Sequence, residues 1–198
     1  MGRFPAAQKT REIRERGRKY MRTKIQNKTA SAEIESLGAQ LMSLKNAEGT
    51  EYLWQGNPAF WSSRAPVLFP TVGNVRGGTT IINGKPYALK RHGFARNLEH
   101  SVLDSGANFI AYSLKDSEET RKLYPFVFEL RVTYRLIENG LTTEFAVFNR
   151  GDEELRLGSA AIRDSVARWF RGSALRITAS CSKKRRRPIA RPLTSRQV

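Results

Sequence analysis

The sequence predicts an all-β protein built as an antiparallel β-sandwich. Between residues 30 and 149, short apolar runs alternate with polar residues at a period of two, which is typical of half-buried strands. Gly, Asn and Pro separate these runs, as they do at turns. At 198 residues the chain is long enough for one domain with a hydrophobic core, and it contains no internal repeat.

The first strands are expected directly after residue 30. Ser31–Leu37 and Ala39–Leu44 each alternate polar and apolar side chains, and Gly38 separates them, which predicts two strands. A turn should follow at Asn46–Gly49, because Asn and Gly favour turn conformations. Glu51–Gln55 are expected to form a third strand.

Three hairpins are expected farther along the chain. Asn83-Gly84 lies between two β-prone segments, and Asn-Gly is a strong hairpin signal because both residues tolerate positive φ. The second hairpin should turn at Ser105–Asn108 and the third at Glu138–Gly140. In the third, the alternation predicts that one face of the strand lies in the core, made either of the following residues or of their neighbours: Phe126, Phe128, Leu130, Val132 and Tyr134.

Positive charge is concentrated at the two ends of the chain. Residues 1–20 hold seven basic and two acidic side chains and residues 159–198 hold eleven and one, so residues 21–158 carry only +2 of the net +17. We expect residues 1–20 to be a basic extension that could fray as a helix. Residues 159–198 are expected to be a basic tail of low order, because their charged second half lacks periodicity and contains Pro188 and Pro192.

The run KKRRRP at Lys183–Pro188 is the strongest argument for a nucleic-acid partner. Such runs can neutralise phosphates or act as nuclear localisation signals. Interleaved aromatic side chains that would stack on bases are missing from it. Because the charge is separated from the predicted sandwich, we do not favour nucleic acid as a partner, and binding through the basic ends stays an alternative reading.

The single cysteine, Cys181, makes an intrachain disulfide impossible. A reducing cytoplasm is therefore the default location. Residues 1–20 contain no apolar signal-peptide core, and no window approaches the ~20 apolar residues that a membrane helix needs. We expect a cytoplasmic protein with no membrane partner.

His92 is the first candidate for a functional side chain. It lies in KRHGFARN, after a hairpin strand and next to Gly93, which allows backbone to approach a ligand closely. Taken alone, this pattern favours an ordinary hydrogen-bonded loop histidine. The surrounding motifs reverse that preference.

APVLFPTVGN at residues 65–74, HGFARN, YPFVFEL at Tyr124–Leu130 and VFN at Val147–Asn149 occur in this order. The combination resembles the aldose 1-epimerase (galactose mutarotase-like) family, and within it the bacterial members that carry an HGFAR motif. The resemblance covers about residues 24–149 and only the N-terminal half of the family's domain. It implies a galactose mutarotase-like supersandwich that is C-terminally truncated.

The resemblance also implies an activity. Family members interconvert the α and β anomers of an aldose by acid–base ring opening, with neither a metal nor an organic cofactor, so the expected partner is a small aldose or sugar phosphate. The family histidine that matches His92 binds and polarises the sugar. Arg76 and Arg96 are candidate substrate-binding residues, because a guanidinium holds pairs of oxygens in fixed geometry. Each could equally be solvated or paired with a carboxylate, and residues 74–77 depart from the commoner GRLKDG pattern.

The other catalytic groups of the family do not appear in this sequence. The family's acid is a histidine in a GGHP-type segment and its base is a later glutamate, whereas Gly158–Ser165 here read GSAAIRDS. We therefore expect anomer exchange to be very weak or absent, since removing one proton-transfer group commonly costs ~10²–10⁴-fold in rate. The alternative within the sugar class is a noncatalytic carbohydrate or sugar-phosphate binding domain that uses His92, Arg76 and Arg96.

A reading-frame shift would explain the basic tail. Synonymous codons for Ser159–Ala179 can be chosen so that another frame reads GGHPGF, which suggests that residues 159–198 are an out-of-frame product. At the other end, Arg14–Tyr20 can be encoded by a purine-rich run like a ribosome-binding site, which makes Met21 the expected start. The predicted organisation is an extension (1–20), a partial sandwich (21–158) and a tail (159–198).

The remaining aromatic and histidine residues give weaker signals. Trp54, Trp61 and Phe94 could stack on a sugar face, but an aromatic residue in a β-rich chain is more often part of the core. His100 stands between Glu99 and Ser101 with no motif around it, which predicts a surface residue.

Overall fold

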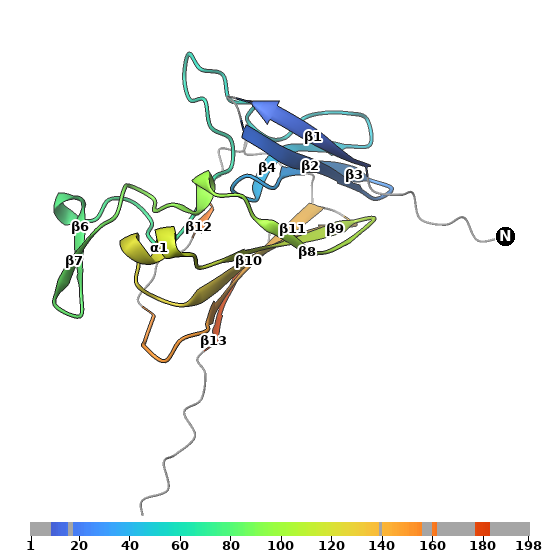
Figure 1. The fold of residues 1–198 in the computed structure, drawn as a ribbon. Helices are drawn as coiled ribbons and strands as arrows, with labels where there is room; N and C mark the ends of the chain where they lie inside the picture. The colour runs from blue at the N-terminus through green and yellow to red at the C-terminus, as the bar shows by residue number, and fades with distance from the viewer. Residues whose placement is uncertain (1–8, 16–17, 139, 156–159, 162–176, 183–198) are drawn as a thin grey trace, which may run out of the picture.

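A computed structural model describes residues 9–15, 18–138, 140–155, 160–161 and 177–182. Two antiparallel-rich sheets face each other, and two short two-stranded sheets lie beside them (Figure 1). The predicted all-β sandwich is confirmed: in the described ranges the longest helix has only six residues, α1 (Glu118–Leu123). No helix in the described ranges is long and apolar enough to cross a membrane.

The first sheet contains four antiparallel strands in chain order, β1-β2-β3-β4. The expectation of a helix near the N-terminus is wrong, because β1 pairs with β2 along its whole length and β2 begins before Met21. The local charge favoured a frayed extension, but in the structure the backbone N–H and C=O groups of this segment form hydrogen bonds with a neighbouring strand. The strands are β1 (Lys9–Glu15), β2 (Arg18–Gln26), β3 (Ala30–Glu35) and β4 (Gln40–Asn46).

The second sheet has the order β13-β11-β10-β9-β8. Its neighbours are antiparallel except β13, which lies parallel to β11. The tail is thus not irregular throughout, since Cys181 belongs to β13. The strands are β8 (Ser101–Gly106), β9 (Phe109–Lys115), β10 (Phe128–Ile137), β11 (Gly140–Asn149) and β13 (Ile177–Ser182).

The small sheets contain one hairpin and one distant pairing. The hairpin expected at Asn83-Gly84 is confirmed, with φ of 51° and 77° at these residues. It lies to the side of the large sheets (Figure 1). The elements are β5 (Val67–Leu68), which pairs with β12 (Ala160–Ala161), the hairpin of β6 (Thr79–Ile82) and β7 (Lys85–Ala88), and the short 3₁₀ helices η1 (Arg76–Gly78) and η2 (Ala95–Asn97).

The third strand expected at Glu51–Gln55 does not form. Glu51 makes only an isolated bridge to Lys45. Its carboxylate accepts hydrogen bonds from the hydroxyl of Ser43 and from the backbone N–H of Leu44 at 2.8 Å. The backbone N–H of Tyr52 also donates to the carbonyl of Leu44 at 2.8 Å, so the segment lies beside β4 through single contacts and forms no regular strand.

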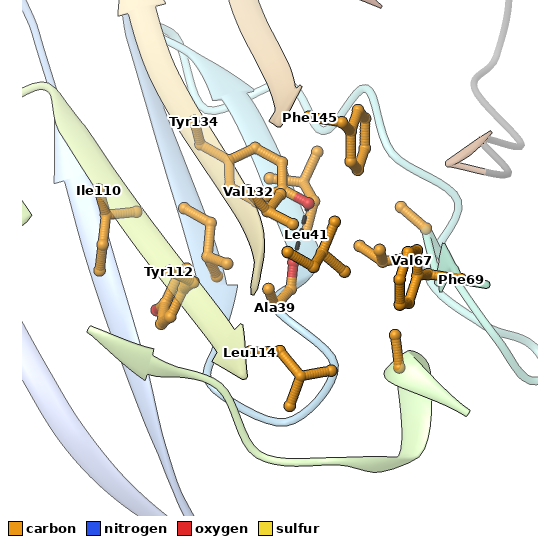
Figure 2. Packing of buried hydrophobic residues seen from close by; sticks show 14 of the residues in the cluster. Ala39, Leu41, Val67, Phe69, Ile110, Tyr112, Leu114, Val132, Tyr134 and Phe145 are labelled. Carbon is orange, nitrogen blue, oxygen red and sulfur yellow. Dashed lines mark hydrogen bonds between the residues drawn. The ribbon is translucent and has the colours of Figure 1, made fainter. Parts of the chain in front are cut away.

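The hydrophobic core fills the space between the two large sheets (Figure 2). Alternate residues of β9 and β10 face residues of β3, β4 and β5, and Tyr134 donates its hydroxyl to the carbonyl of Ala39 at 2.8 Å. Burying each large apolar side chain contributes about 1.5–3 kcal/mol. The structure decides which face of this strand lies in the core, because the five residues named from the alternation are at most 5% exposed: Phe126, Phe128, Leu130, Val132 and Tyr134.

Candidate functional site

The segment that carries His92 is held against the start of the loop after β5. Phe94 and Ala95 donate their backbone N–H groups to the carbonyl of Phe69 at 2.9 and 3.2 Å. Gly93, at φ 69°, passes so close that an added Cβ would lie 2.1 Å from the same oxygen. Only glycine fits this crossing, which explains why His92 is followed by Gly93.

His92 is fixed by a reciprocal pair of hydrogen bonds with Gly73. The backbone N–H of His92 donates to the carbonyl of Gly73 at 2.8 Å. In return, the N–H of Gly73 donates to Nδ1 of the imidazole at 3.0 Å. Because Nδ1 accepts this bond, the proton of the neutral ring lies on Nε2. Nε2 has no hydrogen-bond partner among the described residues.

The backbone of His92 is left-handed, with φ of 68°. This conformation costs a residue with a side chain about 1–2 kcal/mol. The two bonds to Gly73 and the crossing at Gly93 hold the residue there despite that cost. Left-handed non-glycine residues concentrate at binding and catalytic sites.

The charges around His92 favour its neutral form. Burial lowers the pKa of His92 below 6.5, and the nearby positive charges of Arg91 and Arg96 lower the pKa further. Arg96 is half-buried and its guanidinium donates to the carbonyl of Arg91 at 3.5 Å. At neutral pH His92 is therefore an uncharged ring that can donate one hydrogen bond through Nε2.

Arg76 lies apart from His92, in an open cleft of about 590 Å³ lined by residues 74–78 and 88–91. This cleft contains neither His92 nor Arg96. Its lining begins next to Gly73, the residue that binds His92. The structure thus brings His92 close to Arg96 and places Arg76 in an adjoining cleft.

Two cations of the cleft were not among the candidates from the sequence. Lys90 and Arg91 both line it, and Arg91 also acts electrostatically on His92. The available signal was the run KRH at residues 90–92, in which charge immediately precedes the histidine. Arg76 is brought to the same cleft by the tertiary structure, in which the N–H of Leu89 donates to the carbonyl of Gly78 at 3.0 Å.

The aromatic candidates do not line this cleft. Phe94 is 8% exposed and packs with ring centroids 6.1 Å from both Phe69 and Phe128, so it belongs to the core. Trp54 donates its indole N–H to the carbonyl of Trp61 at 2.7 Å. That bond closes the loop after β4.

The prediction that His100 is a surface residue is wrong. His100 is 1% exposed, and its backbone N–H donates to the carbonyl of Ser36 at 2.8 Å. Nδ1 donates to the carbonyl of Leu98 at 3.1 Å, while Nε2 is buried and has no partner in the part of the chain that the structure describes. Burial lowers the pKa of His100 to about 4. The sequence signal was weak because the residue is covered by packing between distant segments.

Comparison with known proteins identifies the family of this chain. The family model of aldose 1-epimerase matches residues 21–161. This match spans more than half of the chain, and the chain therefore belongs to the aldose 1-epimerase family, as the sequence motifs predicted.

The relatives agree with that assignment. Protein LacX of Lactococcus lactis subsp. lactis is 35% identical over 139 residues, which cover 68% of this chain and 46% of LacX. A galactose mutarotase related enzyme from Lactobacillus acidophilus superimposes with a TM-score of 0.72 at 39% identity, covering 78% of this chain and 52% of that one. A galactose mutarotase-like protein from Lactobacillus casei gives 0.59 at 36% identity, covering 61% and 41%. The chain spans about half the length of the relatives it matches.

Proposed function

We propose that this chain binds an aldose through His92 and that it interconverts the sugar's anomers weakly at most. The observation that carries the proposal is the neutral imidazole, whose Nδ1 accepts the N–H of Gly73 and whose Nε2–H is left to donate. A neutral donor held in one tautomer suits a sugar oxygen, which accepts hydrogen bonds readily. Family membership makes an aldose the expected ligand.

Anomer exchange needs more than this donor. A base must remove the proton of the anomeric hydroxyl while an acid protonates the ring oxygen, so that the C1–O5 bond breaks and the open-chain aldehyde forms. Rotation about C1–C2 and the reverse proton transfers then close the other anomer. His92 would polarise the sugar during these steps without changing its own charge.

The sequence offers few candidates for the acid. It contains two histidines, and the second, His100, is buried at 1% exposure with its only donor bound to Leu98. His100 is therefore unable to protonate a ring oxygen from the surface. This supports weak or absent exchange and keeps noncatalytic sugar binding as the second candidate function.

Two measurements on the full chain test the proposal. Calorimetric titration with D-glucose and D-galactose should give saturable binding, and polarimetry starting from pure α-D-glucose should show little acceleration over buffer. His92→Asn keeps an acceptor for Gly73 and tolerates the left-handed backbone, but it loses the Nε2 donor, so binding should weaken about 3–10-fold. Lys85→Gln, at an exposed position outside the cleft, should change neither result.

The outcomes separate the two readings. Binding with exchange well above buffer would make the chain a competent epimerase, and binding without exchange would favour the noncatalytic reading. If neither sugar binds, or if His92→Asn binds as tightly as the parent, the role assigned to His92 is wrong. Nucleic-acid binding through the basic ends and a cytoplasmic location stay predictions from the sequence.

A further inference from the structure

The turn of the β6–β7 hairpin carries a chemically reactive pair of residues. Asn83 and Gly84 connect the two strands, both are exposed, and the hairpin lies to the side of the large sheets (Figure 1). An asparagine loses its side-chain amide when the backbone nitrogen of the next residue attacks the amide carbon. Glycine in that next position favours the attack, because it has no Cβ to hinder the close approach.

The attacking nitrogen is free in the structure. The backbone N–H of Gly84 donates to no described residue, whereas the flanking residues Ile82 and Lys85 pair with each other across the hairpin. A Cβ added to Gly84 would meet nothing within 4 Å, so the space beside it is open. The nitrogen can therefore react without first losing a hydrogen bond to the described part of the chain.

The side chain of Asn83 connects this hairpin to the loop after β11. Its Nδ2 donates to Oε2 of Glu153 at 2.7 Å, across 70 positions of the sequence. The loop is itself held, because Nδ2 of Asn149 donates to the carbonyl of Glu153 at 2.7 Å and Oδ1 of Asn149 accepts the N–H of Gly151 at 3.1 Å. The amide that the reaction would remove is thus the donor that joins the hairpin to an ordered loop.

From these observations we propose that Asn83 is a site of spontaneous deamidation, and that the reaction releases the β6–β7 hairpin from the loop after β11. The nitrogen of Gly84 forms a bond to Cγ of Asn83 and gives up its proton. The bond from Cγ to Nδ2 breaks, and the amide nitrogen takes that proton and leaves as ammonia. Water then opens the cyclic imide and leaves an aspartyl or isoaspartyl residue, so water is the only co-reactant.

The product reverses the interaction with Glu153. An ionised carboxylate at position 83 has no hydrogen to donate, and its charge faces the carboxylate of Glu153. Like charges at an exposed site destabilise by about as much as opposite charges stabilise. The hairpin therefore opens more often after the reaction than before it.

The first test follows the reaction in the folded, full chain during incubation at pH 8 and 37 °C. Mass spectrometry of tryptic peptides should show the mass gain of an amide that becomes a carboxyl, and it should accumulate at Asn83. Asn108 is the internal control, because it also lies in a hairpin turn but donates to the carbonyl of Leu136 at 3.1 Å and precedes Phe109. Gly84→Ala should slow the reaction several-fold. If Asn83 reacts in urea but stays intact in the folded chain, the fold protects it and the proposal is wrong.

The second test measures hydrogen exchange of the β6–β7 backbone. Asn83→Asp, which mimics the product, should speed exchange there by about 2–5-fold. Adding Glu153→Gln to this variant removes the repulsion and supplies a new amide donor, so exchange should return to the rate of the parent. Equal exchange in the parent and in Asn83→Asp would show that the bond to Glu153 does not hold the hairpin.

Discussion

The backbone N–H of Gly73 donates to Nδ1 of His92 at 3.0 Å, and the backbone N–H of His92 returns a bond to the carbonyl of Gly73 at 2.8 Å. This reciprocal pair fixes both the position and the tautomer of the imidazole. It also joins the loop after β5 to the segment after β7. The chemistry proposed for His92 therefore depends on backbone geometry at several glycines, and the first prediction tests one of them.

Gly93→Ala should severely destabilise the fold. The new Cβ would lie 2.1 Å from the carbonyl oxygen of Phe69 and 2.7 Å from Cδ of Pro70, at φ of 69°. We expect a loss of about 3 kcal/mol or more in the free energy of unfolding, measured by urea denaturation. Gly84→Ala is the matched control, because it has φ of 77° but no atom within 4 Å. It should cost only about 1 kcal/mol; similar losses in both variants would contradict the role of the close contact.

His100 should make the fold sensitive to mild acid. The folded chain holds the pKa of His100 near 4, against 6.5 for a free histidine. Between these values the unfolded chain binds more protons, so the free energy of unfolding rises with pH. The free energy of unfolding should have its full value above pH 6.5. It should fall by on the order of 3 kcal/mol as pH is lowered to 4.

Urea denaturation at half-unit steps from pH 7 to pH 4 measures this loss. His100→Gln does not titrate, so its stability should vary much less over the same range, whatever its absolute value. A variant that keeps the full pH dependence of the parent would exclude His100 as its source.

Glu129 should control stability at lower pH. Its side chain is 4% exposed and accepts from Nε of Arg131 at 2.6 Å, from Nε of Arg150 at 3.1 Å and from the hydroxyl of Ser113 at 3.1 Å. The pKa of Glu129 is lowered from 4.5 to about 2, and the hydrogen bond from Arg131 is the largest cause. Because the folded pKa is the lower one, this stabilisation is present above pH 4.5 and is lost as pH falls toward 2.

Glu129→Gln should therefore cost about 2–3 kcal/mol at pH 7 and progressively less below pH 4.5. Glu144→Gln, at an exposed site on β11, should change stability by less than about 0.5 kcal/mol. Chemical denaturation at pH 7 and pH 3 provides the comparison. A cost for Glu129→Gln that stays constant with pH would contradict the ionic role of this carboxylate.

Tyr134→Phe should weaken the contact between the two sheets. It removes the hydroxyl that donates to the carbonyl of Ala39 at 2.8 Å, in a place where Tyr134 is 1% and Ala39 0% exposed. Leaving a buried carbonyl unpaired costs about 1–3 kcal/mol. Tyr87→Phe is the control, because Tyr87 is half-buried and its hydroxyl has no partner among the described residues. Equal midpoints for both variants in urea would show that the bond contributes nothing.

Local sequence was sufficient to predict the hairpins and the core face of β10. Side chains of a strand alternate between two faces, so the pattern predicts that one face is buried, and the structure shows that Phe128 and Val132 are on it. Asn83-Gly84 likewise determines its own turn, because both residues adopt positive φ at low cost. The ordered motifs between residues 65 and 149 identified the family, because each of them is a run of contiguous residues.

Contacts between distant segments had to come from the tertiary structure. His100 looked exposed because nothing in its neighbours reveals its burial or the bond from its backbone N–H to the carbonyl of the distant residue Ser36. Residues near the N-terminus looked like a frayed extension because their own sequence does not reveal that β1 pairs with β2. The pairing of β13 with β11 was likewise not visible from the sequence of the tail.

The sequence by itself therefore determined the strand periodicity, the tight turns, the family and the candidacy of His92, all of which depend on neighbouring residues. Only the tertiary structure decided the tautomer of His92, the burial of His100 and the gathering of Arg76 with Lys90 and Arg91 around one cleft. Burial and electrostatic coupling depend on distance in space, which chain folding sets and spacing along the sequence does not reveal.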